Sequence, residues 1–194
     1  MKITTKTLAG VIVLAALVVV FDYTMKYSGL KIPFPVPGLE FLVFDFTGVP
    51  IILSLLLYGL VPGAFTSGIA VLAILARSGK VISALMKGIA EFSTVLGMFL
   101  GFKTAKRFGL PAAVLLGVIV RVLVMAAANF ALIYFGLISI PTSYKEISLT
   151  YLILTGVFNA IQGCISIGFG CIIYIAIERR IPTLRKNIAV KHKG

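Results

Sequence analysis

Charged residues are scarce in this sequence of 194 residues. Only 12% of the residues are charged and 60% are hydrophobic, whereas a soluble domain carries roughly 25% charged residues. Two charge-free apolar runs, from Phe46 to Ala76 and from Ile147 to Ile177, are longer than the roughly 20 residues that a helix needs to cross a bilayer. The scarcity of charge therefore excludes a water-soluble domain and predicts an integral protein of the lipid bilayer.

Residue types that support catalysis and metal binding are also few. The one histidine, His192, lies in the polar C-terminal stretch, and the six acidic residues are spread along the chain without an evident pair. A metal cluster or a Ser–His arrangement therefore cannot be assembled. The stretch from Gly97 to Thr104 comes within one residue of a phosphate loop, but Phe102 holds the place of the second glycine and no strand precedes it. We expect no enzyme activity and no cofactor.

The two cysteines, Cys164 and Cys171, do not indicate a disulfide. They lie in one apolar run, and their spacing corresponds to about 10.5 Å along a helix axis. This separation is too large for a disulfide. We interpret both cysteines as packing residues.

The formal net charge of +12 does not indicate a nucleic-acid partner. Most basic residues stand at the ends of apolar runs, as do cytoplasmic flanks that meet anionic lipid. Lys2 and Lys6 precede an apolar run from Leu8 to Phe21 that resembles a secretory signal. No small-residue cleavage site follows this run, so we expect it to be retained as the first helix.

The number of membrane helices depends on the run from Phe46 to Ala76. Its middle, Gly59-Leu60-Val61-Pro62-Gly63, could kink one long helix or turn the chain between two short ones. The positive-inside rule does not decide, because six helices with the N-terminus inside and five with it outside place equal numbers of basic residues in the cytoplasm. The apolar runs alone leave both topologies open.

Small residues recur at every fourth position in two runs. Such stripes let helix backbones approach closely in lipid, where apolar burial does not drive association, and they predict a compact bundle. The stripes are Ser93, Gly97 and Gly101 in one run and Gly156, Ala160, Cys164 and Gly168 in the other.

Polar side chains inside apolar runs are the most informative residues. Burying an unpaired amide or charge in hydrocarbon costs about several kcal/mol, so each such group needs a partner, and a ligand can be one. Two helix stripes carry such groups, because their residues are spaced three or four apart. The stripes are Arg121, Met125 and Asn129 in one run and Thr155, Asn159 and Gln162 in the last run.

These polar groups are expected to converge in one half of the membrane. At 1.5 Å per residue, Asn129 lies roughly 10 Å from the end of its helix and Asn159 roughly 16 Å from the start of the next, and both ends join the loop around Pro141. In the six-helix topology Glu91 lies on the same side, as a solute pocket requires. The alternative is that the polar groups only hold helices together. For Arg121 we expect a structural role, pairing with backbone carbonyls or Glu91.

The polar stripes carry a family resemblance that spans nearly the whole chain. Arg121-Val-Leu-Val-Met125-Ala-Ala-Ala-Asn129-Phe130 is similar to the Arg-x-x-x-Met-x-x-x-Asn-Tyr pattern of riboflavin-specific S components of energy-coupling factor (ECF) vitamin transporters. Phe158-Asn159-Ala-Ile-Gln162-Gly163 resembles their Phe-Asn-x-x-Lys-Gly, with Gln162 in place of lysine. The stretches 44–50 and 58–64 resemble the family's Asp-x-Ser-x-x-Pro segment and the Gly-Pro-x-x-Gly turn between its second and third helices.

The resemblance implies an all-α fold, an integral membrane bundle of six transmembrane helices in a single domain, 1–194. It favours six helices over five, because the family's turn separates the second and third helices. Both termini would be cytoplasmic and the protein multi-pass in the plasma membrane. The expected helices are 7–25, 46–60, 62–77, 84–102, 109–136 and 147–178, followed by a basic cytoplasmic tail, 179–194.

The resemblance also implies a function. The protein would capture riboflavin or a related flavin from outside for ATP-driven uptake, with a transmembrane coupling subunit and two ABC-type ATPases as partners. The loop from Tyr27 to Phe44, with its three prolines, would be a stiff lid. An S component for another small heterocycle and a ligand-free structural or assembly subunit are the alternatives. The expected substrate-binding residues are Asn129, Asn159, Gln162, Glu91, Met125, Phe158, Phe41 and Arg121.

Overall fold

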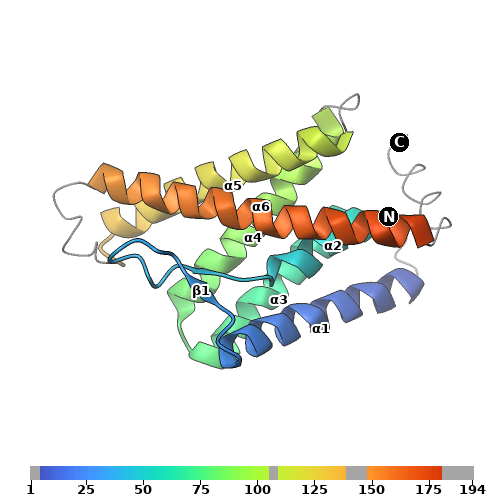
Figure 1. Ribbon diagram of the computed structural model, residues 1–194, viewed down its shortest axis with the longest axis horizontal. Helices are drawn as coiled ribbons and strands as arrows, with labels where there is room; N and C mark the ends of the chain where they lie inside the picture. Colours follow the sequence, from blue (N-terminus) through green and yellow to red (C-terminus); the bar gives the residue numbers. More distant parts are fainter. Residues whose placement is uncertain (1–4, 105–108, 139–147, 181–194) are drawn as a thin grey trace.

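The protein is described by a computed structural model covering residues 5–104, 109–138 and 148–180, and these residues form a helical bundle (Figure 1). A two-stranded antiparallel hairpin, β1 (Ile32–Pro33) and β2 (Val43–Phe44), lies in the connection between the first two helices. The helices are α1 (Thr5–Tyr27), α2 (Gly48–Tyr58), α3 (Leu60–Ser78), α4 (Val81–Thr104), α5 (Gly109–Tyr134) and α6 (Ser148–Arg180).

The described residues contain five helices that are long and apolar enough to cross a membrane, and α2 is a shorter apolar helix. With 11 residues, α2 is only about 16 Å long, roughly half of a bilayer core. The six expected helices are therefore present, but α2, within the expected helix 46–60, is shorter than a helix that crosses a bilayer. Five helices can span the bilayer and one is of half length.

The chain turns between α2 and α3 at Gly59, so the run from Phe46 to Ala76 is not one kinked helix. Gly59 has a φ of 98°, which a glycine adopts without the steric cost that a side chain brings. Its N–H donates to the carbonyl of Leu55 and closes α2. Pro62 lies in the first turn of α3, where its missing N–H costs no helix hydrogen bond.

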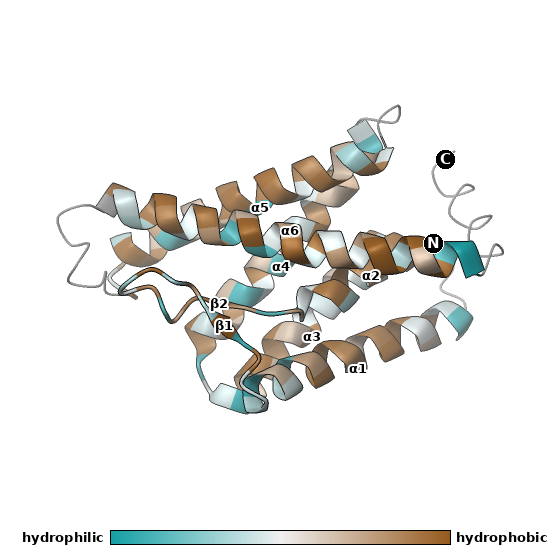
Figure 2. Ribbon diagram, in the orientation of Figure 1, coloured by the Kyte–Doolittle hydropathy of each residue, from teal (hydrophilic) through white to brown (hydrophobic). Residues whose placement is uncertain are grey.

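The short helix α2 occupies the centre of the bundle. Every residue from Gly48 to Leu56 is buried, as expected for a helix that is hydrophobic on all sides. Helices α1, α3, α4 and α6 pack against it, and the start of α1 and the end of α6 lie at the same end of the bundle (Figure 1). The outer helices are hydrophobic along most of their length (Figure 2), which is the surface that a bilayer requires.

The first stripe of small residues brings two backbones into contact, and the second does not. A Cβ added to Gly101 would lie 2.5 Å from Cα of Ala113, and one added to Gly97 would lie 2.5 Å from the carbonyl oxygen of Leu116. The stripe on α4 therefore packs directly on the α5 backbone, as expected. On α6, a Cβ added to Gly168 would have no neighbour within 4 Å, so the expected close approach is absent there.

We predict that Gly101→Ala lowers the free energy of unfolding by about 1–3 kcal/mol, because the added methyl group overlaps backbone atoms of α5 that cannot move aside. The matched control is Gly168→Ala, where the methyl group meets open space and alanine favours the helix. Unfolding in mixed detergent micelles measures both variants. Equal stability of the two would contradict the tight contact between α4 and α5.

Candidate ligand-binding site

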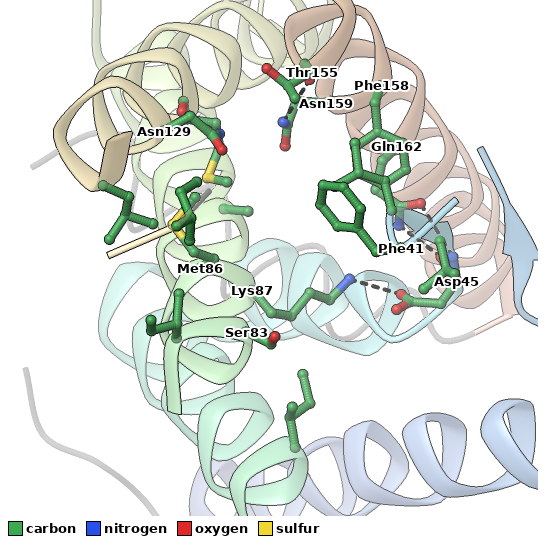
Figure 3. Close-up of a pocket in the computed structure, with 18 of the residues that line it drawn as sticks. Phe41, Asp45, Ser83, Met86, Lys87, Asn129, Thr155, Phe158, Asn159 and Gln162 are labelled. Carbon is green, nitrogen blue, oxygen red and sulfur yellow. Dashed lines mark hydrogen bonds and ion pairs between the residues drawn. The ribbon is translucent and has the colours of Figure 1, made fainter. Parts of the chain in front are cut away.

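A cavity of about 330 Å³ lies between α4, α5, α6 and the connection from α1 to α2. Its size is at the lower end of the range of roughly 300–1,000 Å³ that small-molecule sites occupy. Every expected site residue except Glu91 lines it, so the two polar stripes do meet in space (Figure 3). These lining residues are Phe41, Arg121, Met125, Asn129, Phe158, Asn159 and Gln162.

Two asparagines, on different helices, present oxygen atoms to the cavity. Nδ2 of Asn129 donates to the carbonyl of Met125 on α5, and Nδ2 of Asn159 donates to the carbonyl of Thr155 on α6, each at 2.8 Å. Both amides thus bond to their own helices. Their Oδ1 atoms accept no hydrogen bond from the described residues, so the cavity offers two acceptors for the N–H or O–H groups of a solute.

A chain of alternating charges runs behind and beside the cavity. Nζ of Lys87 lies 2.8 Å from Oδ1 of Asp45 and 2.9 Å from Oε1 of Glu91. Glu91 is completely buried and also pairs with Arg121 at 3.3 Å. The guanidinium of Arg121 further donates to Thr94 at 3.0 Å. The expected pairing of Arg121 with Glu91 is therefore present, and Glu91 supports the wall rather than lining the cavity.

Sequence reasoning missed Lys87 and Asp45, which both line the cavity. Lys87 directly precedes the apolar run that starts at Gly88, so it reads as a flanking cation. Its spacing of four residues from Glu91 on α4 is the signal that could have identified it, because residues four apart share a helix face. Asp45 carries no such helix-spacing signal, because its ion-pair partner Lys87 lies on a helix distant in sequence.

The connection between α1 and α2, residues 28–47, covers the cavity and is called the lid. Two lid rings pack on the ring of Phe158 on α6. The centroid of the Phe34 ring lies 5.6 Å from that of Phe158, and the centroid of the Phe44 ring lies 4.9 Å from that of Phe158. Leu39 at the turn of the hairpin is completely buried. The lid is thus packed on α6, and Phe41 from the lid and Phe158 from α6 both line the cavity (Figure 3).

Charged side chains hold both ends of the lid. At its start, Asp22 on α1 pairs with Lys31 of the lid at 2.7 Å and with Arg77 at the end of α3 at 2.6 Å. At its end, Asp45 pairs with Lys87. Burial alone would raise the pKa of Asp45, but the Lys87 ammonium and the hydrogen bonds from Lys87 and Thr47 hold that pKa below its usual value. The carboxylate therefore stays ionised and keeps its attraction for Lys87.

Gln162 does not project a free amide into the cavity. Its Nε2 donates to the carbonyl of Asp45 at 2.8 Å and to Oγ of Ser166 at 3.3 Å, and its Oε1 accepts the backbone N–H of Asp45 at 3.2 Å. The expected position of Gln162 beside Asn159 on α6 is present. Most of its hydrogen-bonding capacity, however, is taken up by the lid backbone.

We predict that Lys87→Met lowers the free energy of unfolding by about 3–5 kcal/mol, because Asp45 loses its ion-pair partner in a buried site. Adding Asp45→Asn to this variant removes the stranded charge, so the double variant should lose less stability than the sum of the two single variants. Lys80→Met removes an exposed lysine and is the control. If Lys87→Met and Lys80→Met had the same free energy of unfolding, the ion pair between Lys87 and Asp45 would not stabilise the fold.

No protein-family model matches the sequence, and no curated protein matches it. Among solved structures, the chain is similar to the one described as "Structure and mechanism of the S component of a bacterial ECF transporter". The sequences are 24% identical, the match covers 93% of this chain and 98% of the other, and the TM-score is 0.65. The likeness at this identity establishes the fold: the chain has the membrane-embedded helical fold of that S component.

Proposed function

We propose that the protein is a substrate-binding membrane subunit of the ECF S-component type, and that the cavity under the lid is its substrate site. The observation that carries the proposal is the cavity itself. It lies inside a membrane bundle with the fold of an S component, and two helices present unoccupied acceptor oxygens to it. A cavity that combines apolar walls with a few convergent polar groups is typical of small-molecule sites.

The substrate we propose is riboflavin or a related flavin. A flavin has a planar ring that Phe41 and Phe158 can contact, and it has N–H and O–H groups that the oxygens of Asn129 and Asn159 can accept. The sequence patterns around both asparagines resemble those of riboflavin-specific S components. In this proposal Met125 contacts the ring from α5, while Arg121 and Glu91 support the wall through their ion pair.

The hydrogen bonds of the two asparagines count against the ligand-free alternative. If these amides served to hold helices together, they would bond from one helix to another. Asn129 and Asn159 instead donate to carbonyls of α5 and α6, the helices that carry them. An S component for another small heterocycle stays the alternative, because the same acceptors suit any ring system with suitable donors.

The proposal includes partners that supply energy. The sequence contains no complete phosphate loop, so ATP hydrolysis would come from two ABC-type ATPases, joined to this subunit by a transmembrane coupling subunit. In the plasma membrane the lid would face outside to receive the substrate. The start of α1 and the end of α6 lie at the opposite end of the bundle from the lid (Figure 1), so both termini would then be cytoplasmic.

We predict that the purified protein binds riboflavin more tightly than thiamine or biotin, measured by quenching of flavin fluorescence and by thermal stabilisation with each ligand. Asn159→Ala should weaken riboflavin binding by about 1–3 kcal/mol, because a donor of the ligand loses its acceptor. Thr104→Ala deletes a hydroxyl that bonds to its own helix far from the cavity and is the matched control. Stabilisation by another heterocycle but not by riboflavin would favour the alternative substrate.

We predict that the subunit alone does not accumulate riboflavin in liposomes against a gradient, even with ATP enclosed or added. The physical reason is that the sequence contains no complete phosphate loop to bind the nucleotide whose hydrolysis would drive uptake. Radiolabelled riboflavin uptake measures this, with protein-free liposomes as the control for leakage. ATP-dependent accumulation by this chain alone would refute the proposed dependence on partners.

A further inference from the structure

Asp45 lies near the end of the lid, and its backbone is held by a side chain from α6. The carbonyl and the N–H of Asp45 are both bonded to the amide of Gln162, at 2.8 Å and 3.2 Å. Gln162 is 1% exposed and Asp45 is 5% exposed. Asp45 follows β2 directly, and the Gln162 amide bonds both backbone polar groups of Asp45, as a neighbouring strand would.

We propose that Gln162 is the latch of the lid: a positioning residue that keeps the lid closed and so sets how fast a bound solute leaves. This proposal rests on the proposed function only in that the cavity holds a solute. It differs from the reading of Gln162 as a ligand contact. Both N–H groups of its amide are already donated, one to Asp45 and one to Ser166, so little capacity is left for a ligand.

The position of the latch makes it effective. Helix α2, which begins directly after the lid, is buried along nearly its whole length and cannot move without breaking the core. A lid that opens must therefore turn close to Asp45, where the mobile and the fixed parts of the chain meet. Lys87 holds the side chain of Asp45, and Gln162 holds its backbone. Opening would leave buried donors and acceptors without partners.

The rings of the lid give a different kind of contact. Phe34 and Phe44 pack on Phe158 without fixed hydrogen-bond directions, so they can slide or separate gradually. The amide of Gln162 has a defined geometry that is either formed or broken. Gln162 thus supplies the directional part of lid closure, and its loss should free the lid while the helices around the cavity stay packed.

The test measures lid opening in the ligand-free, full-length protein. Leu39→Cys places a thiol in the lid at a completely buried position, and Cys164→Ala removes the exposed native cysteine. The buried native Cys171 stays as an internal reporter of global loosening. In this background Gln162→Met, which keeps the length of the side chain and removes the amide, should raise the rate of maleimide labelling at residue 39 roughly tenfold. Labelling of Cys171 should not change.

Two further variants keep the test decisive. Gln162→Asn is shorter by one methylene group, so it should also speed labelling, and it replaces the methionine variant if that one does not fold. Thr66→Val removes a buried hydroxyl that bonds within α3, away from the lid, and should leave labelling at residue 39 unchanged. An unchanged rate of labelling at residue 39 in both Gln162 variants would contradict the proposal. An equal increase in the labelling rates of residue 39 and Cys171 would also contradict it, because the whole fold would then have loosened.

The release of riboflavin separates this inference from the proposed function. Stopped-flow fluorescence should show riboflavin leaving the Gln162 variants roughly tenfold faster than the parent protein. Faster release without faster labelling of the lid would make Gln162 a ligand contact and overturn the latch. Faster labelling in a protein that binds no riboflavin would support the latch and refute the flavin proposal instead.

Discussion

The structure depends on one buried chain of charges, in which Asp45, Lys87, Glu91 and Arg121 alternate in sign at separations of 2.8, 2.9 and 3.3 Å. An unpaired charge in surroundings of low polarity costs about several kcal/mol. Each of the four therefore fixes the position of the next. This requirement for pairing holds the end of the lid, α4 and α5 together beside the cavity.

The half-length helix α2 explains why a loop residue can join a buried charge chain. Because α2 starts in the middle of the bundle, the lid must run inward from the end of α1 to reach it (Figure 1). The last lid residues are then enclosed by α4 and α6, and Asp45 is 5% exposed although it is in no helix. A full-length α2 would begin at the membrane surface, and the lid could not contact the interior. The short helix thus makes room for the cavity and directs the lid over it.

Features that depend on local spacing could be predicted from the sequence, and features that depend on distant partners could not. Spacings of three and four residues predicted that Asn129 and Asn159 share a face with other polar groups, and the cavity contains both. The partner of Gln162 lies 117 residues away, beyond any helical period. Hydrophobic runs left five and six helices open, and the family resemblance favoured six. The length of α2 could not be predicted from the runs, since apolar residues continue into α3. Likewise, the four-residue spacing of the small residues on α6 predicts that Gly168 shares a helix face with them. It does not predict that no other helix in the described part of the chain packs against that face at Gly168.

The cavity wall and the lid are held by contacts of different kinds, and this difference decides which part can move. On the wall side, α4 and α5 touch through backbone atoms around Gly101, and their ion pair is fully buried. Separating them would break close packing and strand charges together, so this side opens only with the fold as a whole. The lid is held by ion pairs at its two ends, Lys31 with Asp22 and Asp45 with Lys87. Between these ends it packs on α6 through ring contacts, so this middle part has less to break than the wall. A solute site needs this combination, because affinity requires a wall of fixed geometry and exchange requires a cover that opens at lower cost.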